Sequence, residues 1–282
     1  MSKLFVYGTL RNGEKNHFYL NHSTLIFNQC WVSGSLFDTG NGYPVMLKDE
    51  INTVYGELYE VTSEQLNEID RLEGFVEDDP GNLYDRESVT VTNDKGHDFE
   101  AFTYFGGESL IDSTDKIATG DWNVHMYLTQ QDLHYFAYGS CMDNERFKLQ
   151  GVNHHFESVV GNGSLNGFVL KFSRNSNDGG KADIVEDSSE TVEGKLYEVP
   201  LDAITYLYKR EGVYANAYRP IIVTINARDK EIRAITFIGT EKEAETPPTV
   251  KYASEIIRGS KGFLSDAYVD KLQKKIDLLL KN

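Results

Sequence analysis

Cysteine, long apolar runs and an export signal are scarce or missing in this sequence. The two cysteines, Cys30 and Cys141, are too few for the disulfide framework of a small secreted domain. Apolar runs such as residues 221–223 and 278–280 fall far short of a membrane-spanning helix. The N-terminus lacks the charged, apolar and small-residue zones of a secretory signal. We therefore expect a soluble, cytoplasmic protein that has no membrane partner.

Basic residues are also fewer than acidic residues. Lysine and arginine number 28 against 44 aspartates and glutamates, which gives a net charge of −16. Nucleic acids and anionic membranes would repel such a chain, although a small basic pocket remains compatible with it. The histidines show no metal-ligand spacing with cysteines or carboxylates. Dinucleotide, Walker and Gly-x-Ser-x-Gly motifs are missing.

The most informative feature that is present is an internal repeat. Four segments of the first half return in the same order in the second half, at offsets of 131 to 138 residues. They are residues 5–10 and 136–141, 56–61 and 194–199, 72–74 and 210–212, and 101–104 and 234–237. Shorter repeats of roughly 20–50 residues indicate a solenoid, whereas a unit this long indicates duplicated domains. We place the two domains at residues 1–129 and 133–282.

Each predicted domain is rich in strands and carries one prominent helix. Alternating or β-branched patterns predict strands at residues 3–7, 54–61, 88–92 and 100–105, and again at 135–138, 192–199, 220–225 and 232–238. A capping box of Thr62 and Gln65 predicts a helix that ends at Gly74. The helix of the second domain begins at Pro200 and ends at Gly212. Residues 251–280 predict an additional helical tail.

The repeated turn after the opening strand is a candidate binding element. In Tyr-Gly-Thr-Leu and Tyr-Gly-Ser-Cys, Gly8 and Gly139 allow a sharp turn and a close approach of the backbone to a ligand. Successive amide groups in such a turn form a nest for a carboxylate or carbonyl oxygen. A single copy would be read as an ordinary turn, but the duplication favours a site.

Two glutamates are the candidate general bases. Glu73 and Glu211 each occupy the last helical turn, directly before a glycine. The negative end of the helix dipole disfavours a carboxylate there and raises its pKa, and an apolar pocket raises it further. Arg71 and Arg210 lie close enough in sequence to oppose this shift. A solvated surface glutamate is the alternative interpretation, but the same unfavourable placement in both copies indicates a site.

Together these residues resemble the gamma-glutamylcyclotransferase superfamily over nearly the whole chain. Residues 7–11, 42–44, 73–74, 84 and 120–122 are similar to the gamma-glutamylamine-cyclotransferase-like branch. Residues 136–140, 179–182, 211–212, 218 and 252–259 are similar to the glutathione-type gamma-glutamylcyclotransferase branch. One departure is Cys141, which stands where that branch usually has asparagine, so an amide that could orient the substrate is missing.

The resemblance implies an α+β fold of two tandem small mixed β-barrels, each with one prominent helix, and a C-terminal helical tail on the second. It also implies a transferase of the acyltransferase type, or an amide-cyclising lyase, related to glutathione metabolism. In this activity the α-amine of a gamma-glutamyl compound attacks its own γ-carbonyl, and the enzyme releases 5-oxoproline and an amine or amino acid. Glu73 and Glu211 would be the catalytic acid–base groups. The implied substrate-binding residues are Tyr7, Gly8, Thr9, Leu10, Tyr84, Tyr138, Gly139, Ser140, Cys141, Met142, Tyr218 and Tyr252.

The resemblance implies neither a metal nor an organic cofactor, and we expect a monomer or weak dimer that takes a small-molecule substrate. Two other interpretations remain open. One or both domains could be non-catalytic modules that bind a gamma-glutamyl metabolite, or the tandem barrels could form an interaction protein. Retention of both glutamates favours catalysis, while Cys141 keeps the alternatives open for the second domain.

Overall fold

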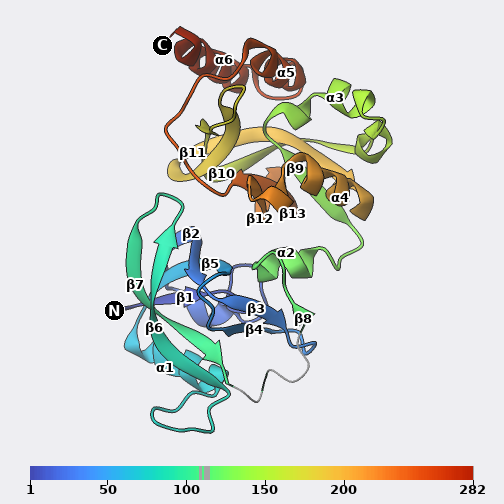
Figure 1. Cartoon of the computed structure of the whole chain (residues 1–282). Helices are drawn as coiled ribbons and strands as arrows, with labels where there is room; N and C mark the ends of the chain where they lie inside the picture. Colours follow the sequence, from blue (N-terminus) through green and yellow to red (C-terminus); the bar gives the residue numbers. More distant parts are fainter. Residues whose placement is uncertain (108–109, 111–114, 282) are drawn as a thin grey trace. The chain divides into compact units, whose positions relative to one another are not determined.

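Each half of the chain forms a closed five-stranded β-barrel, as Figure 1 shows. The computed structural model describes residues 1–107, 110 and 115–281, and the chain divides into two units, residues 1–126 and 127–282. These units are the first and the second domain. Several helices lie outside the barrels, which confirms the predicted α+β fold of two tandem mixed barrels. Among the described residues, no helix is long and apolar enough to cross a membrane.

The barrel of the first domain has the strand order β1-β5-β2-β6-β7. Its elements are β1 (Ser2–Val6), η1 (His17–Leu20), β2 (Thr24–Ser33), β3 (Ser35–Asp38), β4 (Pro44–Leu47), β5 (Thr53–Val61), α1 (Ser63–Glu73), β6 (Tyr84–Asn93), β7 (Asp98–Gly106), β8 (Asp115–Lys116) and α2 (Trp122–Tyr127). Neighbouring barrel strands are antiparallel, except that β1 and β7 pair in parallel and thereby close the ring. Strands β4, β3 and β8 form a small separate sheet.

Alternation along β1 explains how this barrel is filled and covered. Phe5 packs in one buried cluster with Leu58 of β5, whereas Leu4 packs in a second cluster with Ile69 of α1. Successive side chains of a strand point to opposite faces, so one face of β1 meets the neighbouring strands and the other meets α1. Full burial of an isoleucine stabilises the fold by about 1.5–3 kcal/mol, and Ile69 is completely buried. This packing holds α1, and with it Glu73, against the barrel.

The second domain repeats this topology with the strand order β10-β11-β9-β13-β12. Its elements are β9 (Leu133–Ala137), η3 (Ser140–Met142), α3 (Asn144–Leu149), η4 (Asn153–Phe156), β10 (Val159–Arg174), β11 (Lys181–Val199), α4 (Leu201–Arg210), η5 (Val213–Ala215), β12 (Tyr218–Ala227), β13 (Lys230–Gly239), α5 (Val250–Ser260) and α6 (Asp266–Lys281). Strand β9 pairs in parallel with β13, as β1 does with β7. The predicted strand 192–199 is only the end of β11. The predicted tail is two helices, because the chain turns at Gly262, whose φ is +73°.

The duplication extends to single hydrogen bonds. In both barrels the tyrosine after the opening strand donates to a carbonyl at the end of the closing strand, and a buried threonine of the closing strand donates to the opening strand. These bonds are Tyr7 to Tyr104 O (2.8 Å) and Tyr138 to Phe237 O (2.5 Å), and Thr103 to Phe5 O (3.1 Å) and Thr236 to Phe136 O (2.8 Å). The repeated motif around residues 5–9 and 136–140 is therefore also a structural requirement of barrel closure.

The repeated glycines Gly56 and Gly194 have a steric reason. A Cβ atom at Gly56 would lie 2.3 Å from Val6 O, and one at Gly194 would lie 2.5 Å from Ala137 O. Each position also faces the ring of the opening strand's phenylalanine. Only glycine allows so close an approach between the strands.

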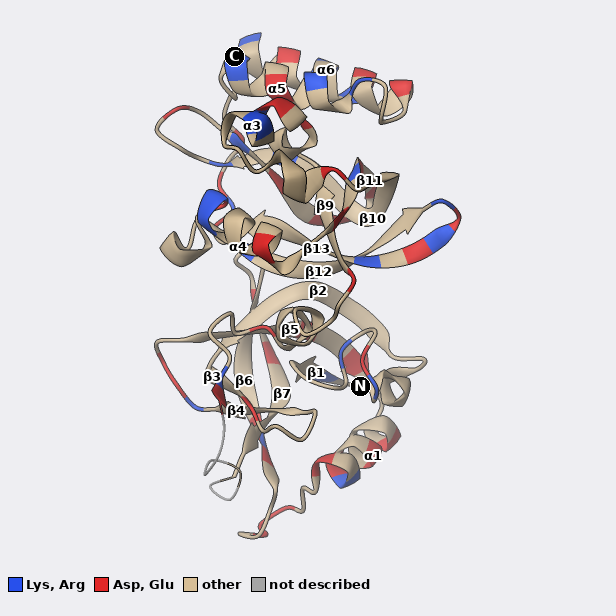
Figure 2. Ribbon diagram, turned by 90° about the vertical axis from the view of Figure 1, so that its right-hand side faces the viewer, with Lys and Arg blue, Asp and Glu red and all other residues tan. Residues whose placement is uncertain are grey.

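Part of the acidic excess lies on the exposed faces of helices. Figure 2 shows acidic residues along α1 and a mixture of acidic and basic residues along α6. The outward-facing Glu64 and Glu68 of α1 are exposed, while its Leu66 and Ile69 are buried. This distribution is that of a solvated face on an amphipathic helix.

Two candidate active sites

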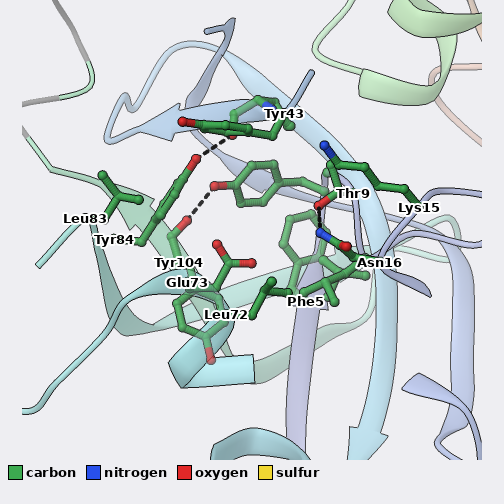
Figure 3. A pocket seen from close by; sticks show the side chains of 15 residues that line it. Phe5, Thr9, Lys15, Asn16, Tyr43, Leu72, Glu73, Leu83, Tyr84 and Tyr104 are labelled. Atoms are coloured by element: carbon green, nitrogen blue, oxygen red, sulfur yellow. Dashed lines mark hydrogen bonds between the residues drawn. The ribbon is translucent and has the colours of Figure 1, made fainter. Parts of the chain in front are cut away.

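A cavity of about 190 Å³ opens beside the turn that follows β1. Figure 3 shows Glu73 pointing into it from the end of α1, facing Tyr84 and the loop that carries Thr9. The lining residues are Phe5, Val6, Tyr7, Gly8, Thr9, Leu10, Lys15, Asn16, Tyr43, Pro44, Leu72, Glu73, Leu83, Tyr84 and Tyr104. The structure thus brings together, around one space, every residue of the first domain that the sequence predicts for the site.

Helix α1 is fixed at both ends, and this fixes Glu73. The capping box forms as predicted: Thr62 Oγ1 accepts from the Gln65 amide at 3.2 Å, and Gln65 Oε1 accepts from the Thr62 amide at 3.0 Å. At the other end Gly74 adopts the left-handed conformation, with φ +68°. Glu73 is consequently the last helical residue, at the edge of the cavity.

Burial raises the pKa of Glu73 to about 7. Its neighbours in the cavity wall include the apolar side chains of Leu72 and Leu83. Arg71, which could have opposed the shift, is exposed and makes no ion pair with Glu73 among the described residues. A carboxyl group that titrates near neutrality is suited to accept and return a proton.

The loop opposite Glu73 offers free backbone donors. The amide of Arg11 donates to Gly8 O at 3.0 Å and so closes the turn. In the part of the chain that the structure describes, the amides of Gly8, Thr9 and Leu10 have no protein acceptor. A Cβ atom at Gly8 would lie 2.7 Å from the Pro44 ring, so the loop fits tightly under β4. These amides can bind substrate oxygens.

The tyrosines of the first cavity form its wall. The Tyr7 hydroxyl donates to Tyr104 O, and the Tyr84 hydroxyl donates to Pro44 O at 2.9 Å (Figure 3). Burial, and then the nearby Glu73, raises the pKa of Tyr84. Both side chains therefore stay neutral, and their hydroxyl protons are already committed to carbonyl groups. Their oxygen lone pairs remain available to accept a hydrogen bond.

A buried ion cluster anchors the loop from behind. Arg11 lies 3.2 Å from Glu57 of β5 and 2.7 Å from Asp121, and all three side chains are almost fully buried. Glu57 also accepts from the Asn12 amide at 2.9 Å and from the Tyr59 hydroxyl at 2.9 Å. Removal of one partner of such a cluster leaves an uncompensated buried charge and costs about 3–5 kcal/mol.

The site of the second domain has a narrow inner part and a wide outer part. The inner space, about 30 Å³, has room for about one or two water molecules, whereas the outer cavity is about 410 Å³. Both are lined by Ser140, Glu211, Tyr218 and Tyr252. Tyr138, Gly139 and Cys141 line only the inner space. The outer wall is basic, with Arg146, Arg174, Lys181, Arg210 and Lys251 against Asp178, Glu211 and Glu255.

Glu211 differs from Glu73 in having charged and polar neighbours. Arg210 Nε lies 3.5 Å from Glu211 Oε1 and donates to Cys141 Sγ at 3.0 Å. The Cys141 thiol in turn lies 3.5 Å from the same carboxylate oxygen. Burial raises the pKa of Glu211, and the Arg210 guanidinium opposes that rise. Arg71 and Arg210 were both expected to oppose such a rise, and the geometry provides this opposition in the second domain.

Met142 lies outside both cavities. Its side chain is fully buried, and its amide donates to Gly139 O at 3.0 Å within the turn. Its carbonyl accepts from Lys195 Nζ at 2.6 Å. The structure therefore does not bring Met142 to the predicted site, because both of its backbone groups already serve the loop.

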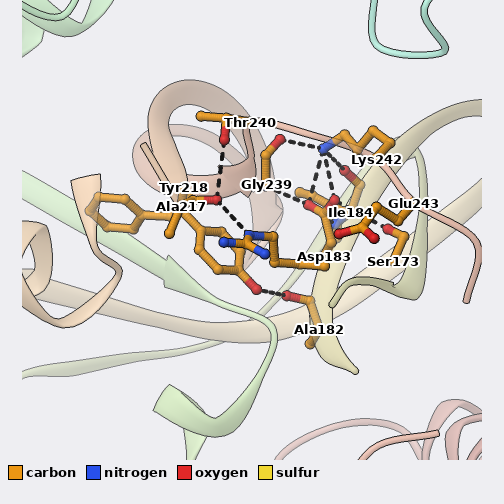
Figure 4. Close-up of polar contacts among 12 residues, drawn as sticks. Ser173, Ala182, Asp183, Ile184, Ala217, Tyr218, Gly239, Thr240, Lys242 and Glu243 are labelled. Atoms are coloured by element: carbon orange, nitrogen blue, oxygen red, sulfur yellow. Dashed lines mark hydrogen bonds and ion pairs between the residues drawn. The ribbon is translucent and has the colours of Figure 1, made fainter. Parts of the chain in front are cut away.

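Tyr218 and Tyr252 are held at the cavity by contacts around the end of β13, and Figure 4 shows those of Tyr218 and Asp183. Completely buried Asp183 accepts from the Gly239 amide and lies 2.8 Å from Lys242 Nζ. This pair fixes the chain that leaves β13 for α5, where Tyr252 accepts from the Ala182 amide at 3.2 Å. The Tyr218 hydroxyl donates to Ala182 O at 2.8 Å, as Tyr84 does to Pro44 O.

Several lining residues were not predicted as site residues. Tyr43 and Leu72 had signals, because they belong to the motif of residues 42–44 and to the repeated helix end. Lys15, Asn16 and Arg174 lie in loops or at a strand end whose path in space the residue order does not reveal. Among the described residues, no group of three or more His, Cys, Asp or Glu side chains is placed to hold a metal ion.

Both halves of the chain match models of known protein families. Residues 4–124 match the family model described as gamma-glutamyl cyclotransferase, AIG2-like, and residues 191–272 match the AIG2-like family. YkqA of Bacillus subtilis (strain 168), named among the gamma-glutamylcyclotransferases, is 39% identical over 285 residues and 99% of each chain. The crystal structure of YkqA has a TM-score of 0.88 at 38% identity and covers 99% of this chain and 98% of that one.

Similarity extends to relatives that match less than half of this chain. The gamma-L-glutamyl-butirosin B gamma-glutamyl cyclotransferase of Niallia circulans is 48% identical over 128 residues, 44% of this chain and 78% of that protein. The gamma-glutamylcyclotransferase of Bos taurus is 33% identical over 134 residues, 45% of this chain and 69% of that protein.

Proposed function

Because the chain belongs to the gamma-glutamylcyclotransferase family of enzymes, we propose that it cyclises a small gamma-glutamyl compound to 5-oxoproline and releases an amine or amino acid. The observation that carries this proposal is the cavity of the first domain. There Glu73, whose pKa is about 7, faces three unoccupied loop amides.

The reaction needs positioning and one proton relay. The α-amine nitrogen bonds to the γ-carbonyl carbon, and the amide C–N bond breaks. Glu73 takes a proton from the α-ammonium, which frees the nitrogen lone pair for the attack, and passes that proton to the leaving nitrogen. The second proton that the attacking nitrogen loses goes to the released amine. The amides of Gly8, Thr9 and Leu10 stabilise the negative charge that develops on the substrate oxygen. Holding the amine against the carbonyl supplies much of the rate enhancement, because the attack is intramolecular.

Substitution of the two glutamates in the full-length chain tests this proposal. Glu73→Gln keeps the shape of the first site and removes its base, so we expect that site's turnover to fall about 10²–10⁴-fold. Glu211→Gln does the same for the second site, and the double variant should be inactive. The readout is 5-oxoproline formed from gamma-glutamylamines, gamma-glutamyl amino acids and glutathione. Full activity in the double variant would contradict the proposal.

The narrow inner space of the second domain supports a second candidate for that domain alone, which is binding of a gamma-glutamyl metabolite without turnover. The Glu73→Gln variant decides between the two candidates. If this variant still forms 5-oxoproline from any of the substrates, the second domain is catalytic. If the variant binds a substrate but forms no product, the second domain has a binding role.

A further inference from the structure

The two sites differ at two positions whose side chains, in the second domain, both contact the glutamate. Leu72 and Leu10 line the cavity of the first domain beside Glu73. Their counterparts in the repeat are Arg210 and Cys141. The first cavity thus has an apolar pair where the second has a guanidinium and a thiol, while the glutamate and the glycine after it are the same in both domains.

Arg210 joins the helix end to the loop. Its Nε donates to Cys141 Sγ at 3.0 Å, its Nη2 donates to Ser140 Oγ at 3.3 Å, and Nε lies 3.5 Å from Glu211 Oε1. The Arg210 side chain is 12% exposed and that of Glu211 is 20% exposed. A charge pair this shielded is screened far less by salt than a surface pair.

The other groups around Glu211 do not replace this interaction. Tyr135 and Tyr138 at the end of β9, Tyr218 of β12 and Tyr252 of α5 face it, and burial raises the pKa of each, so they remain neutral. Burial likewise raises the pKa of Cys141, so the thiol stays protonated. Arg146 of α3 also favours the charged carboxylate, but it lies 2.7 Å from its own partner, Glu255. The remaining charged groups of the outer wall are Arg174, Asp178, Lys181 and Lys251.

Around Glu73 the electrostatic setting is different. Tyr7, Tyr84 and Tyr104 face it and are kept neutral by burial. Lys15 lines the same cavity and is exposed. No cation pairs with the Glu73 carboxylate among the described residues, and burial alone accounts for its raised pKa.

We propose that Arg210 is a positioning residue of the second site: it fixes the Glu211 carboxylate against the loop of residues 139–141 and keeps it ionised to lower pH than Glu73. Resting on the proposed function, this gives the chain two active sites with different pH ranges. The second site keeps its base in mildly acidic solution, where the first site has lost its own. A guanidinium at this distance shifts a carboxyl titration by about one to three pH units.

The pH dependence of kcat/KM tests this directly in the full-length chain. Glu73→Gln leaves the second site, and Glu211→Gln leaves the first. We expect the acidic limb of the second site to lie about one pH unit or more below that of the first. In the Glu73→Gln background, Arg210→Leu should move that limb up by about one unit, and Arg210→Lys, which keeps the charge, should leave it close to its original place. A merely structural Arg210 would lower activity without moving the limb.

A titration without substrate keeps the inference testable if the second site proves inactive. Carbon-13 NMR of the glutamate carboxyl groups, with Glu73 and Glu211 assigned from the two glutamine variants, gives each titration midpoint in the resting enzyme. Equal midpoints for the two groups, or an unchanged Glu211 midpoint in Arg210→Leu, would overturn the inference. Absence of product from every substrate would instead contradict catalysis by the second site and leave the NMR result decisive here.

The reciprocal exchange provides a second and independent variant. Leu72→Arg combined with Leu10→Cys installs the Arg210 and Cys141 pair beside Glu73. We expect the Glu73 midpoint to fall by about one unit. The two tryptophans, Trp31 and Trp122, both belong to the first domain, so their fluorescence verifies that this domain is folded in the variant. A folded variant with an unchanged Glu73 midpoint would also overturn the inference.

Discussion

At the residue scale, Glu73 carries both the proposed chemistry and a cost to stability. Its pKa is about 7 in the folded protein and about 4.3 in an unfolded chain. Folding therefore favours the protonated form. The corresponding stability is complete below about pH 4 and is lost as the pH rises through 7. A group that is kept titratable in an apolar cavity destabilises the domain under the conditions in which it works.

Glu73→Gln should consequently stabilise the first domain in a pH-dependent way. Relative to the parent chain, we expect its free energy of unfolding to rise by about 1–3 kcal/mol more at pH 8 than at pH 5, because glutamine has no charge to bury. Urea unfolding followed by tryptophan fluorescence measures this, since Trp31 and Trp122 report on the first domain only. Glu68→Gln, on the exposed face of the same helix, is the control and should show no such pH dependence. A Glu73→Gln domain that is no more stable than the parent at pH 8 would show that Glu73 is solvated.

At the element scale, the sequence predicts the helices and strands that are determined by interactions between residues close together in the chain. The capping box of Thr62 and Gln65 and the left-handed Gly74 are local signals, and helix α1 follows them. Strands β2 and β10 escaped prediction, because their side chains lack a regular alternation and their pairing is interrupted by register shifts. A register shift of this kind adds an unpaired residue to one strand, which breaks the alternation that predicts a strand from sequence.

In the candidate sites, too, the residues could be predicted from the sequence but the contacts between distant residues could not. The repeat pointed to Glu73, Glu211 and the two glycine turns without any knowledge of the fold. The contact between Arg210 and Cys141 could not be predicted, since these residues are 69 positions apart and come together only when α4 packs beside the loop after β9. The sequence therefore did not reveal which of the two arginines contacts its glutamate. Arg210 contacts Glu211, whereas Arg71 is exposed and does not contact Glu73.

The contact of α5 with the loop of the second site allows a test at the element scale. A Cβ atom at Gly259 would lie 2.6 Å from both Asp143 N and Met142 C, in the η3 loop and its cap. Gly259→Ala should lower the stability of the second domain by about 1–3 kcal/mol through this overpacking. Helix propensity alone predicts the opposite, a gain of about 1 kcal/mol.

Thermal unfolding followed by circular dichroism measures this effect. Ser254→Ala, at an exposed position of α5, is the matched control and should leave the second transition nearly unchanged. The tryptophan signal should be the same in both variants, because it reports on the first domain. If Gly259→Ala raised the midpoint of the second domain, the close packing of α5 on the loop would be refuted.

At the scale of the whole molecule, the position of the domain boundary can be tested. We propose domain bounds of 1–129 and 133–282, while the contacts of the chain divide it between Met126 and Tyr127. Tyr127 is 1% exposed, and its hydroxyl accepts from the His134 amide at 2.7 Å and donates to Arg233 O at 3.1 Å. A fragment 127–282 should therefore be about 3 kcal/mol more stable than a fragment 133–282, which lacks this buried ring.

Chemical unfolding of the two fragments measures the difference. Tyr127→Phe in the longer fragment separates the contribution of the hydroxyl, for which we expect about 1 kcal/mol, from that of the ring. Equal stability of the two fragments would show that the second domain begins at residue 133.

The cation that anchors the loop after the opening strand lies on the loop in the first domain and on the barrel in the second. This difference limits which exchanges of sequence between the two copies would still fold. In the first domain a loop cation, Arg11, meets a barrel anion, Glu57. In the second, a barrel cation, Lys195, meets the carbonyl of Met142, at the position that corresponds to Arg11. Recombination between the duplicated halves that joined one loop to the other barrel would bury Arg11 against Lys195, or leave Glu57 without a cation. Either hybrid would lose about 3–5 kcal/mol, a large part of the stability of a domain. A chain that mixed the two copies at this point is therefore expected to fold less stably than one that keeps each loop with its own barrel.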